Sequence, residues 1–277
     1  MNADSTVNIG STHSLCQDYV IARNGSLKNR GPYVILSDGC SSSPDTDIGA
    51  RLLVKAMDQN PPTRAVSDME DFHKESARVA LGWADLIGIG AESVDATLIS
   101  AHVIEDRLIV ACSGDGLIVL ESHTGALDVY AISSPSGYPF YPSYVHQPDR
   151  LADLIDNDRA RKQVKHFCRR SANESLNLID VNISDSLTEV FDLNASGYKY
   201  VAVTSDGIHS FFHTQQSTNG KRVEAICMTE ILEVFWSFKN SQGAFVERRM
   251  KRFKKEAQAK GWQHADDLSI GAIHLGA

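Results

Sequence analysis

Three apolar runs of the chain end in the same way, with an aspartate next to a glycine. They read YVILSDGC at residues 33–40, IVACSGDG at 109–116 and YVAVTSDG at 200–207. Such runs predict buried strands, and a buried strand holds its last residue within a narrow range of positions. The adjacent glycine lets the backbone turn sharply and brings a carbonyl oxygen close to a bound group. The fold is therefore expected to present acidic groups at the ends of rigid strands.

Acidic residues beside predicted strands form a larger set, comprising Asp18, Asp38, Asp115, Asp206 and the pair Asp266–Asp267. Several carboxylates cannot share one site without compensation, because like charges at short range are costly. Carboxylates, a carbonyl and waters are hard oxygen ligands that suit Mg²⁺ or Mn²⁺. The alternative is that each Asp-Gly pair marks an ordinary turn. That reading is adequate for any one pair and weaker for the whole set, since three follow apolar runs with one final pattern.

The hydrophobic pattern also predicts the order of helices and strands. Apolar runs predict strands at about 6–12, 18–23, 33–38, 96–104, 107–113, 117–122, 199–204 and 268–275. Helical spacing predicts helices at 47–59 and 67–86, and a long helical region at about 224–259 with a break near 241–243. Residues 133–150 carry four of the eight prolines and predict a loop, either a flap or a surface connection. This order indicates an α+β fold with mainly antiparallel sheets.

Composition and charge exclude several classes of protein. A net charge of −8 argues against a surface built to bind nucleic acid or anionic lipid. The five cysteines are odd in number, widely spaced and without a CxxC motif, which predicts reduced thiols in a cytoplasmic protein. The N-terminal segment has no basic-then-apolar signal, and no apolar run reaches the roughly 18 residues of a membrane span. We expect a cytoplasmic protein that does not interact with a membrane.

Five segments in order resemble the motifs of one family. They are CQDYV, VILSDGCSSSPDTDIGARLLVKA, DATLISAHVIEDRLIVACSGDGLIVL, YVAVTSDGI and HADDLSIGAIHL. Together they resemble the metal-dependent protein phosphatases of type 2C, the PPM family, and most closely the bacterial branch that reads CQD in its first motif. The resemblance spans about residues 8 to 275. It implies one domain over residues 1–277, an α+β fold in which helices flank a β-sandwich of two antiparallel sheets, and a metal centre at one edge of the sandwich.

The resemblance also implies a role for each acidic residue. Asp38 would bridge two Mn²⁺ or Mg²⁺ ions and Gly39 would lend its carbonyl, while Asp18 would serve the second ion. Asp206 and Asp266 would hold the first ion, and Asp115 with Asp206 would form a third, weaker site. Two such ions lower the pKa of a shared water, which then attacks phosphorus. The expected activity is hydrolysis of phosphoserine and phosphothreonine in proteins, with Asp38 and Asp206 as catalytic residues.

Two positions differ from the common pattern of that family. His13 stands where many members have the arginine that clamps the substrate phosphate, and a protonated imidazole could take part of that catalytic and substrate-binding role. The other interpretation of His13 is a packed or surface histidine. Cys40 stands where some members have a histidine, and a small buried residue is the simpler account of it.

Alternatives and partners complete the expectations from sequence. The basic segment 247–260 predicts either a solvated helix face, with Met250 and Phe253 facing inward, or a docking site for an acidic partner. His209 could reach the metal edge or serve the structure alone. Expected partners are a phosphorylated protein and a cognate serine/threonine kinase. A non-catalytic binding module of the same fold and a small-molecule phosphatase are the alternative functions.

Overall fold

Two antiparallel sheets form the centre of the computed structural model, which describes residues 1–25, 31–62, 69–157, 159–217 and 220–276. The large sheet has seven strands in the order β1-β15-β11-β6-β7-β8-β9, and the small sheet has five in the order β10-β5-β4-β3-β2. The strands of the two sheets are β1 (Asn2–Asn8), β2 (Asp18–Arg23), β3 (Tyr33–Asp38), β4 (Leu98–Ile104), β5 (Arg107–Ser113), β6 (Gly116–Ser122), β7 (Leu127–Ser133), β8 (Lys162–Arg169), β9 (Asn177–Ser184), β10 (Glu189–Asn194), β11 (Tyr198–Thr204) and β15 (Leu268–His274).

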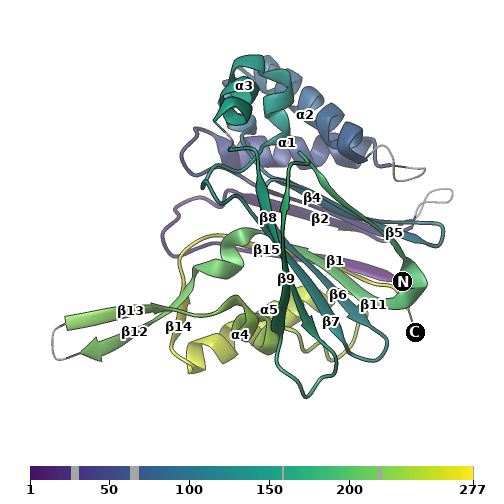
Figure 1. Cartoon of the computed structure of the whole chain (residues 1–277), viewed down its shortest axis with the longest axis vertical. Helices are drawn as coiled ribbons and strands as arrows, with labels where there is room; N and C mark the ends of the chain where they lie inside the picture. Colours follow the sequence, from purple (N-terminus) through teal and green to yellow (C-terminus); the bar gives the residue numbers. More distant parts are fainter. Residues whose placement is uncertain (26–30, 63–68, 158, 218–219, 277) are drawn as a thin grey trace.

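Helices cover the outer face of each sheet, so the molecule has four layers (Figure 1). Helices α1 (Thr46–Gln59) and α2 (Met69–Leu86) pack on the small sheet, with α3 (Pro148–Asp156) beside α2. Helices α4 (Met228–Phe235) and α5 (Phe245–Ala259) pack on the large sheet. A small third sheet contains β12 (Phe211–Ser217), β13 (Gly220–Ala225) and β14 (Trp262–His264). The predicted α+β class and the sandwich of two antiparallel sheets are confirmed.

Coverage on both faces explains why the strands read as continuous apolar runs. In β3, Val34 and Leu36 lie in the core between the sheets, whereas Ile35 lies under α1 and α2. In β11, Val201 and Val203 face the core between the sheets, and Ala202 faces α4 and α5. A strand buried on both faces needs no polar alternation. These strands are therefore rigid supports for whatever residue follows them.

Several predicted element boundaries require correction. The first strand covers Asn2–Asn8 rather than 6–12, because a mostly polar edge strand gives no apolar run. Residues 220–225 form β13, so the helical region predicted from 224 begins only at Met228. The predicted break is present, since α4 ends at Phe235 and α5 begins at Phe245. The second helix is described from Met69, and residues 67–68 of its predicted range lie outside the described residues.

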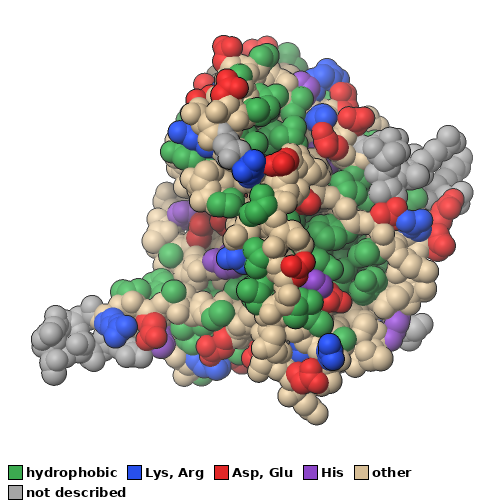
Figure 2. Space-filling model, in the orientation of Figure 1, with side chains coloured by type: hydrophobic (Ala, Val, Ile, Leu, Met, Phe, Trp, Pro, Cys, Tyr) green, Lys and Arg blue, Asp and Glu red, His purple; other side chains and the backbone are tan. Residues whose placement is uncertain are grey.

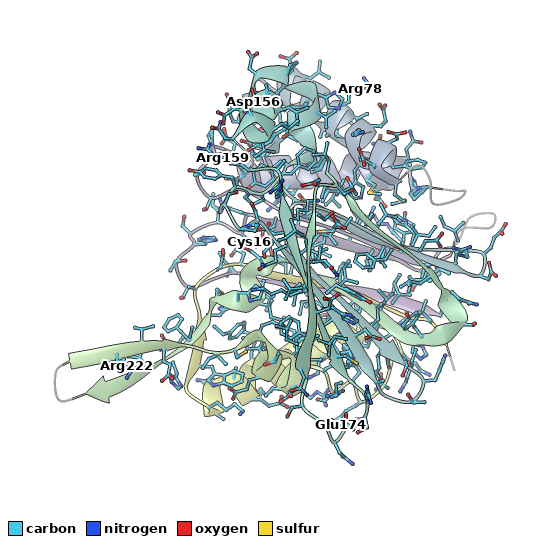
Figure 3. All side chains as sticks on the ribbon, viewed as in Figure 1. Cys16, Arg78, Asp156, Arg159, Glu174 and Arg222 are labelled. Atoms are coloured by element: carbon cyan, nitrogen blue, oxygen red, sulfur yellow. The ribbon has the colours of Figure 1, made fainter. Side chains whose placement is uncertain are left out.

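The outer surface is mixed in charge. Lys and Arg side chains are scattered among acidic and apolar groups on the face shown in Figure 2. In α5, Met250 and Phe253 are buried as predicted, and Arg248, Lys251, Lys254 and Lys255 are exposed. Arg249 departs from the predicted solvated face, because it is buried and donates to the Phe235 and Val234 carbonyls. The hairpin of β12 and β13, where Arg222 lies, projects away from the sandwich (Figure 3). Among the described residues, no helix combines the length and apolar character that crossing a bilayer requires.

Candidate metal centre

Asp18 and Asp38 face each other across two neighbouring strands. Asp18 is the first residue of β2 and Asp38 the last residue of β3, and the two are direct partners in the antiparallel register. Residues paired in this way have Cβ atoms about 5 Å apart, and like charges there are unfavourable. Thr97 fixes the Asp38 backbone, since its Oγ1 accepts from the Asp38 N–H (3.0 Å) and its N–H donates to the Asp38 carbonyl (2.8 Å).

The large sheet contributes Asp206 and Asp266 to the same edge of the sandwich. Asp206 follows β11 at the start of a short 3₁₀ helix, Asp206–Ser210, and Asp266 lies just before β15. The residue between β11 and Asp206 is Ser205, whose hydroxyl donates to Asp18 Oδ2 (2.7 Å) and so links the two sheets. After Asp206 only a glycine fits, because a Cβ on Gly207 would lie 1.7 Å from the Asp267 carbonyl oxygen.

Asp115 lies in the turn that carries the chain from one sheet to the other, between β5 and β6. Glycines flank it, and both Gly114 (φ 99°) and Gly116 (φ 143°) have backbone angles that L-residues with side chains rarely adopt. The acids of the site thus come from both sheets and from the turn that joins them.

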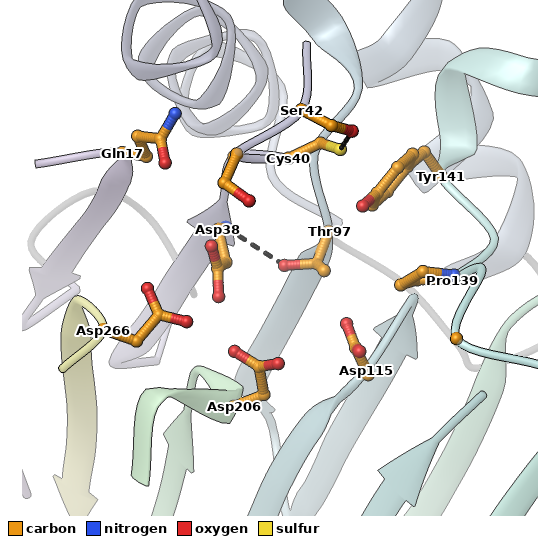
Figure 4. A pocket seen from close by; sticks show the side chains of 13 residues that line it. Gln17, Asp38, Cys40, Ser42, Thr97, Asp115, Pro139, Tyr141, Asp206 and Asp266 are labelled. Carbon is orange, nitrogen blue, oxygen red and sulfur yellow. Dashed lines mark hydrogen bonds between the residues drawn. The ribbon is translucent and has the colours of Figure 1, made fainter. Parts of the chain in front are cut away.

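One cavity of about 270 Å³ collects most of the predicted site residues (Figure 4). Asp38, Asp115, Asp206 and Asp266 point into it from different elements, and Gly39 lies on its wall. Asp18 lies behind Asp38 and is only 3% exposed, so it is not part of the cavity lining. The loop 41–44, whose sequence SSSP is compatible with either phosphate contacts or an ordinary turn, contributes Ser41 and Ser42 to the lining. The cavity is also lined by residues that sequence reasoning did not assign to the site, namely Gln17, Thr97, Gly137, Pro139 and Tyr141.

Burial and mutual repulsion shift the protonation of these carboxyl groups. Burial raises the pKa of Asp18 to about 6, although the nearby hydroxyl groups of Ser269 and Ser205 act in the opposite direction. Burial and the neighbouring charges of Asp18 and Asp206 raise the pKa of Asp38 well above its usual value. Burial and the charge of Asp206 raise the pKa of Asp115 to about 7. A set of acids that resists ionisation together calls for positive charge nearby.

The donors present fit a hard divalent cation. Asp18 Oδ1 is buried and has no hydrogen-bond partner among the described residues, so one oxygen of a carboxyl held by Ser205 remains free to bind another group. The cavity wall offers carboxylate and carbonyl oxygens, the ligands that Mg²⁺ and Mn²⁺ prefer. Within the described residues, no three acidic, histidine or cysteine side chains yet converge into a closed ligand set.

Asp267 has a different role from its neighbour Asp266. It is 1% exposed, and its two oxygens accept from the N–H groups of Gly10 (2.8 Å) and Gln17 (2.6 Å). His13 Nδ1 lies 2.9 Å from Asp267 Oδ2, and His13 Nε2 lies 3.5 Å from Asp266 Oδ1. Asp267 therefore holds the segment 10–17 against the site. His13 lines a neighbouring cavity with Gln17 and Ser41 rather than the acidic one.

Contact with the Asp267 carboxylate raises the pKa of His13, against the effect of its partial burial. A histidine whose pKa is raised on folding adds stability below pH 6.5 that is lost as the pH rises through the raised value. In metal-free protein we expect His13→Gln to lower the free energy of unfolding by about 0.5–1 kcal/mol at pH 6 and by less at pH 8. Urea unfolding measures this difference, which should shrink in an Asp267→Asn background. Equal losses at both pH values would contradict it.

The segment 133–150 forms one wall of the cavity. It contains a 3₁₀ helix, Pro142–His146, and leads into α3. Buried Asp95 fastens it, because both terminal nitrogens of Arg150 donate to the Asp95 carboxylate (2.8 and 2.7 Å). Ser43 and Ser143 also donate to Asp95. The segment thus brings Tyr141 into the cavity opposite Cys40 (Figure 4). His209 is exposed and is not among the residues lining this cavity.

The comparisons with known proteins agree with this architecture. The family model described as protein phosphatase 2C matches residues 10–255. Because that match covers most of the 277 residues, the chain belongs to the protein phosphatase 2C family. Among curated protein sequences, none matches this chain.

Solved structures of bacterial phosphatases share the fold at low sequence identity. Serine/threonine phosphatase Stp1 from Staphylococcus aureus is 13% identical, with a TM-score of 0.54 over 99% of this chain and 95% of that one. The S. agalactiae serine/threonine phosphatase is 15% identical, with a TM-score of 0.53 over 99% of both chains. Mycobacterium tuberculosis PstP/Ppp is 14% identical, with a TM-score of 0.52 over 100% of this chain and 99% of that one. At these identities the likeness concerns the fold alone.

Proposed function

We propose that this protein is a Mn²⁺- or Mg²⁺-dependent phosphatase that hydrolyses phosphoserine and phosphothreonine in proteins. The observation that carries the proposal is the convergence of Asp38, Asp115, Asp206 and Asp266 on one cavity, with raised pKa values for three of them. Membership of the protein phosphatase 2C family supports the reaction class.

Asp38, Asp206 and Asp266 would hold the cations together with the Gly39 carbonyl, and Asp18 would serve from behind Asp38. Asp115 with Asp206 would form a third, weaker site. When bound, the cations supply positive charge for the phosphoryl oxygens and make a water more acidic. Ser205 occupies Asp18 Oδ2 and leaves Oδ1 free, which sets the direction of that carboxyl group. Thr97 holds the backbone at Asp38, so the central carboxylate does not depend on a mobile loop.

Neutral donors on the opposite wall could bind the phosphoryl group. Ser41 and Ser42 line the cavity, and so does the Tyr141 hydroxyl. Burial and the contact with Cys40 raise the pKa of Tyr141, so its hydroxyl keeps its proton and remains a donor. The cavity is small, open and mostly polar, which suits a phosphorylated side chain presented by a larger substrate. A serine/threonine kinase would supply that substrate.

Phosphate release tests the proposal directly. The protein would be stripped with a chelator and assayed with Mn²⁺, with Mg²⁺ and with chelator alone, on phosphoserine and phosphothreonine peptides and on p-nitrophenyl phosphate. We expect turnover only with added cation, and faster turnover on the peptides than on a panel of phosphorylated metabolites. Faster turnover of one metabolite would instead favour a small-molecule phosphatase. Cation binding without any turnover would favour a non-catalytic binding module.

A further inference from the structure

Strand β9 is an apolar strand at the free edge of the large sheet. Among the described residues, it is the last strand in the sheet order and pairs only with β8. Four of its eight residues are large apolar side chains with high exposure: Leu178 51%, Ile179 58%, Val181 44% and Ile183 57%. The strand runs from the β8–β9 turn, where Glu174 lies, toward the end of the molecule that carries α3 (Figures 1 and 3). An exposed apolar edge strand offers unpaired backbone groups with which another strand can pair.

Three of these side chains, those of Leu178, Val181 and Ile183, lie on one face across a β-bulge. His166 pairs with Asp180 and Phe167 with Leu178, which leaves Ile179 as an extra residue in β9. Phe167, Lys165 and Gln163 share a face of β8 by alternation, so their partners Leu178, Val181 and Ile183 share that face of β9. Asp180 and Asn182, the partners of His166 and Val164, lie on the other face, where the Asn182 amide donates to the Asp180 carboxylate (2.7 Å).

The apolar face of β9 continues the core under α4. Phe167 pairs with Val129 of β7, which belongs to that core, and with Leu178 of β9. Leu176, just before the strand, is buried there, and its N–H donates to Glu233 of α4 (3.0 Å). From Leu178 onward the same side of the sheet is exposed. The Val181 N–H donates to Asp180 Oδ1 (2.9 Å), a local bond typical of a donor with no neighbouring strand.

We propose that β9 pairs with β9 of a second copy of this chain, antiparallel and centred on Val181, so that the two large sheets become one. A two-fold axis perpendicular to the sheet keeps each side chain on its own face. Because directly opposite residues share a face and side chains alternate along a strand, the residue numbers of a pair must differ by an even number. Centred on Val181, the register sets Val181 against Val181 of the second copy and Ile179 against Ile183 of the second copy. Asp180 then lies opposite Asn182 of the second copy, an acceptor facing a donor.

Other registers are less favourable. A centre at Asp180 sets two carboxylates directly against each other, which is destabilising. A centre at Asn182 sets Ile179 opposite Asp185 of the second copy. The sequence of β9 is thus complementary to itself in one register, which favours a second copy over an unrelated strand. Since the interface is short, we expect a dissociation constant on the order of 10–100 µM.

Sedimentation equilibrium of the full chain over about 5–500 µM, a range that brackets such an interface, tests the pairing. We expect a monomer–dimer equilibrium that Val181→Glu shifts to monomer by at least tenfold in dissociation constant. Within the chain, the introduced carboxylate lies opposite Lys165, so the variant is expected to fold. Across the dimer it lies opposite the same carboxylate of the second copy, so the two charges repel each other. Val223→Glu is the matched control, because Val223 is also an exposed strand valine (63%) and neighbours Arg222 on the distant hairpin (Figure 3). A monomeric wild type, or a dimer unaffected by Val181→Glu, would overturn the proposal.

Cysteine cross-linking tests the register independently of affinity. In a Cys227→Ser background, which removes an exposed thiol, Val181→Cys should form an intermolecular disulfide under mild oxidation. Paired Cα atoms lie about 5.5 Å apart at such a position, within the range that a disulfide spans. Ile183→Cys in the same background should not cross-link, because its own copy lies four residues further along, roughly 13 Å away. Efficient cross-linking at 183 and not at 181 would reject the register.

Discussion

Asp38→Asn and Asp206→Asn are each expected to lower kcat/KM for a phosphopeptide by about 10³-fold or more, roughly 4 kcal/mol of transition-state stabilisation. Asp38 is the central acid of the cavity, next to Asp18 in the strand register, and Asp206 enters from the other sheet. An amide in either place keeps the shape but removes the negative charge that would hold a divalent cation. Steady-state kinetics at saturating Mn²⁺ measure the effect, and titration of Mn²⁺ separates weaker cation binding from a slower chemical step.

The matched control for these variants is Asp192→Asn. Asp192 lies in β10 of the small sheet and pairs with Arg107, away from the cavity. It should keep activity within about twofold, since surface substitutions away from a site seldom exceed about 0.5 kcal/mol. Circular dichroism would show that all three variants are folded. A folded Asp38→Asn or Asp206→Asn protein with more than a tenth of wild-type activity would contradict the assigned roles.

In metal-free protein, Asp38→Asn is expected to raise stability at pH 7.5, the opposite of its effect on activity. The pKa values of Asp18, Asp38 and Asp115 are raised by folding, to about 6 for Asp18 and about 7 for Asp115. Groups shifted in this direction add stability at low pH that is lost as the pH rises through the folded values. Removing one charge should therefore stabilise the chelated protein by about 1–3 kcal/mol at pH 7.5 and by much less at pH 5.

Urea unfolding in chelator measures the repulsion between the carboxylates, and urea unfolding in Mn²⁺ measures the stabilisation that the bound cation adds. Mn²⁺ at a hundred times its dissociation constant should stabilise wild type by about 2.7 kcal/mol and Asp38→Asn by far less. Burial lowers the pKa of His73 and of His102 to about 3. The protein therefore loses stability as the pH falls below 6.5, because the unfolded chain then binds protons at these residues more readily. That contribution has the opposite sign but is common to both proteins, so it cancels in their difference. A metal-free Asp38→Asn protein less stable than wild type at pH 7.5 would refute the account.

The parts of the fold that the sequence predicted are those buried on both faces. Strands β3 and β11 read as continuous apolar runs because helices cover one side and the other sheet covers the other. Asp38 and Asp206 lie at the ends of these strands, so the apolar runs that end in Asp-Gly predicted most of the acidic residues of the cavity. Strands β8, β9 and β10 gave no comparable signal, since their side chains are mostly exposed or half-buried. Strands buried on both faces give continuous apolar runs in the sequence, whereas strands with exposed side chains do not.

The supporting contacts of the site could not be predicted in this way. Ser205 reaches Asp18 across 187 positions of sequence, and Arg150 reaches Asp95 across 55. A serine or an arginine has many possible partners, and nothing in its local sequence selects one. Likewise, the motif placed His13 beside the site, but the contact with Asp267 depends on how the segment 10–17 folds back onto β15. Tyr141 enters the cavity only because its segment is fastened at Asp95.

The origin of the acids in two different sheets ties the geometry of catalysis to the quality of packing far from it. Asp18 and Asp38 belong to the small sheet and Asp206 to the large one, so their separation is set by how the sheets seat on each other. Val203 and Ile118 are fully buried between the sheets, and their side chains help to set the distance between the sheets. A core residue one methyl group larger or smaller there shifts the sheets by fractions of an ångström. Under the proposed phosphatase function, such a variant would still fold but would turn over its substrate more slowly.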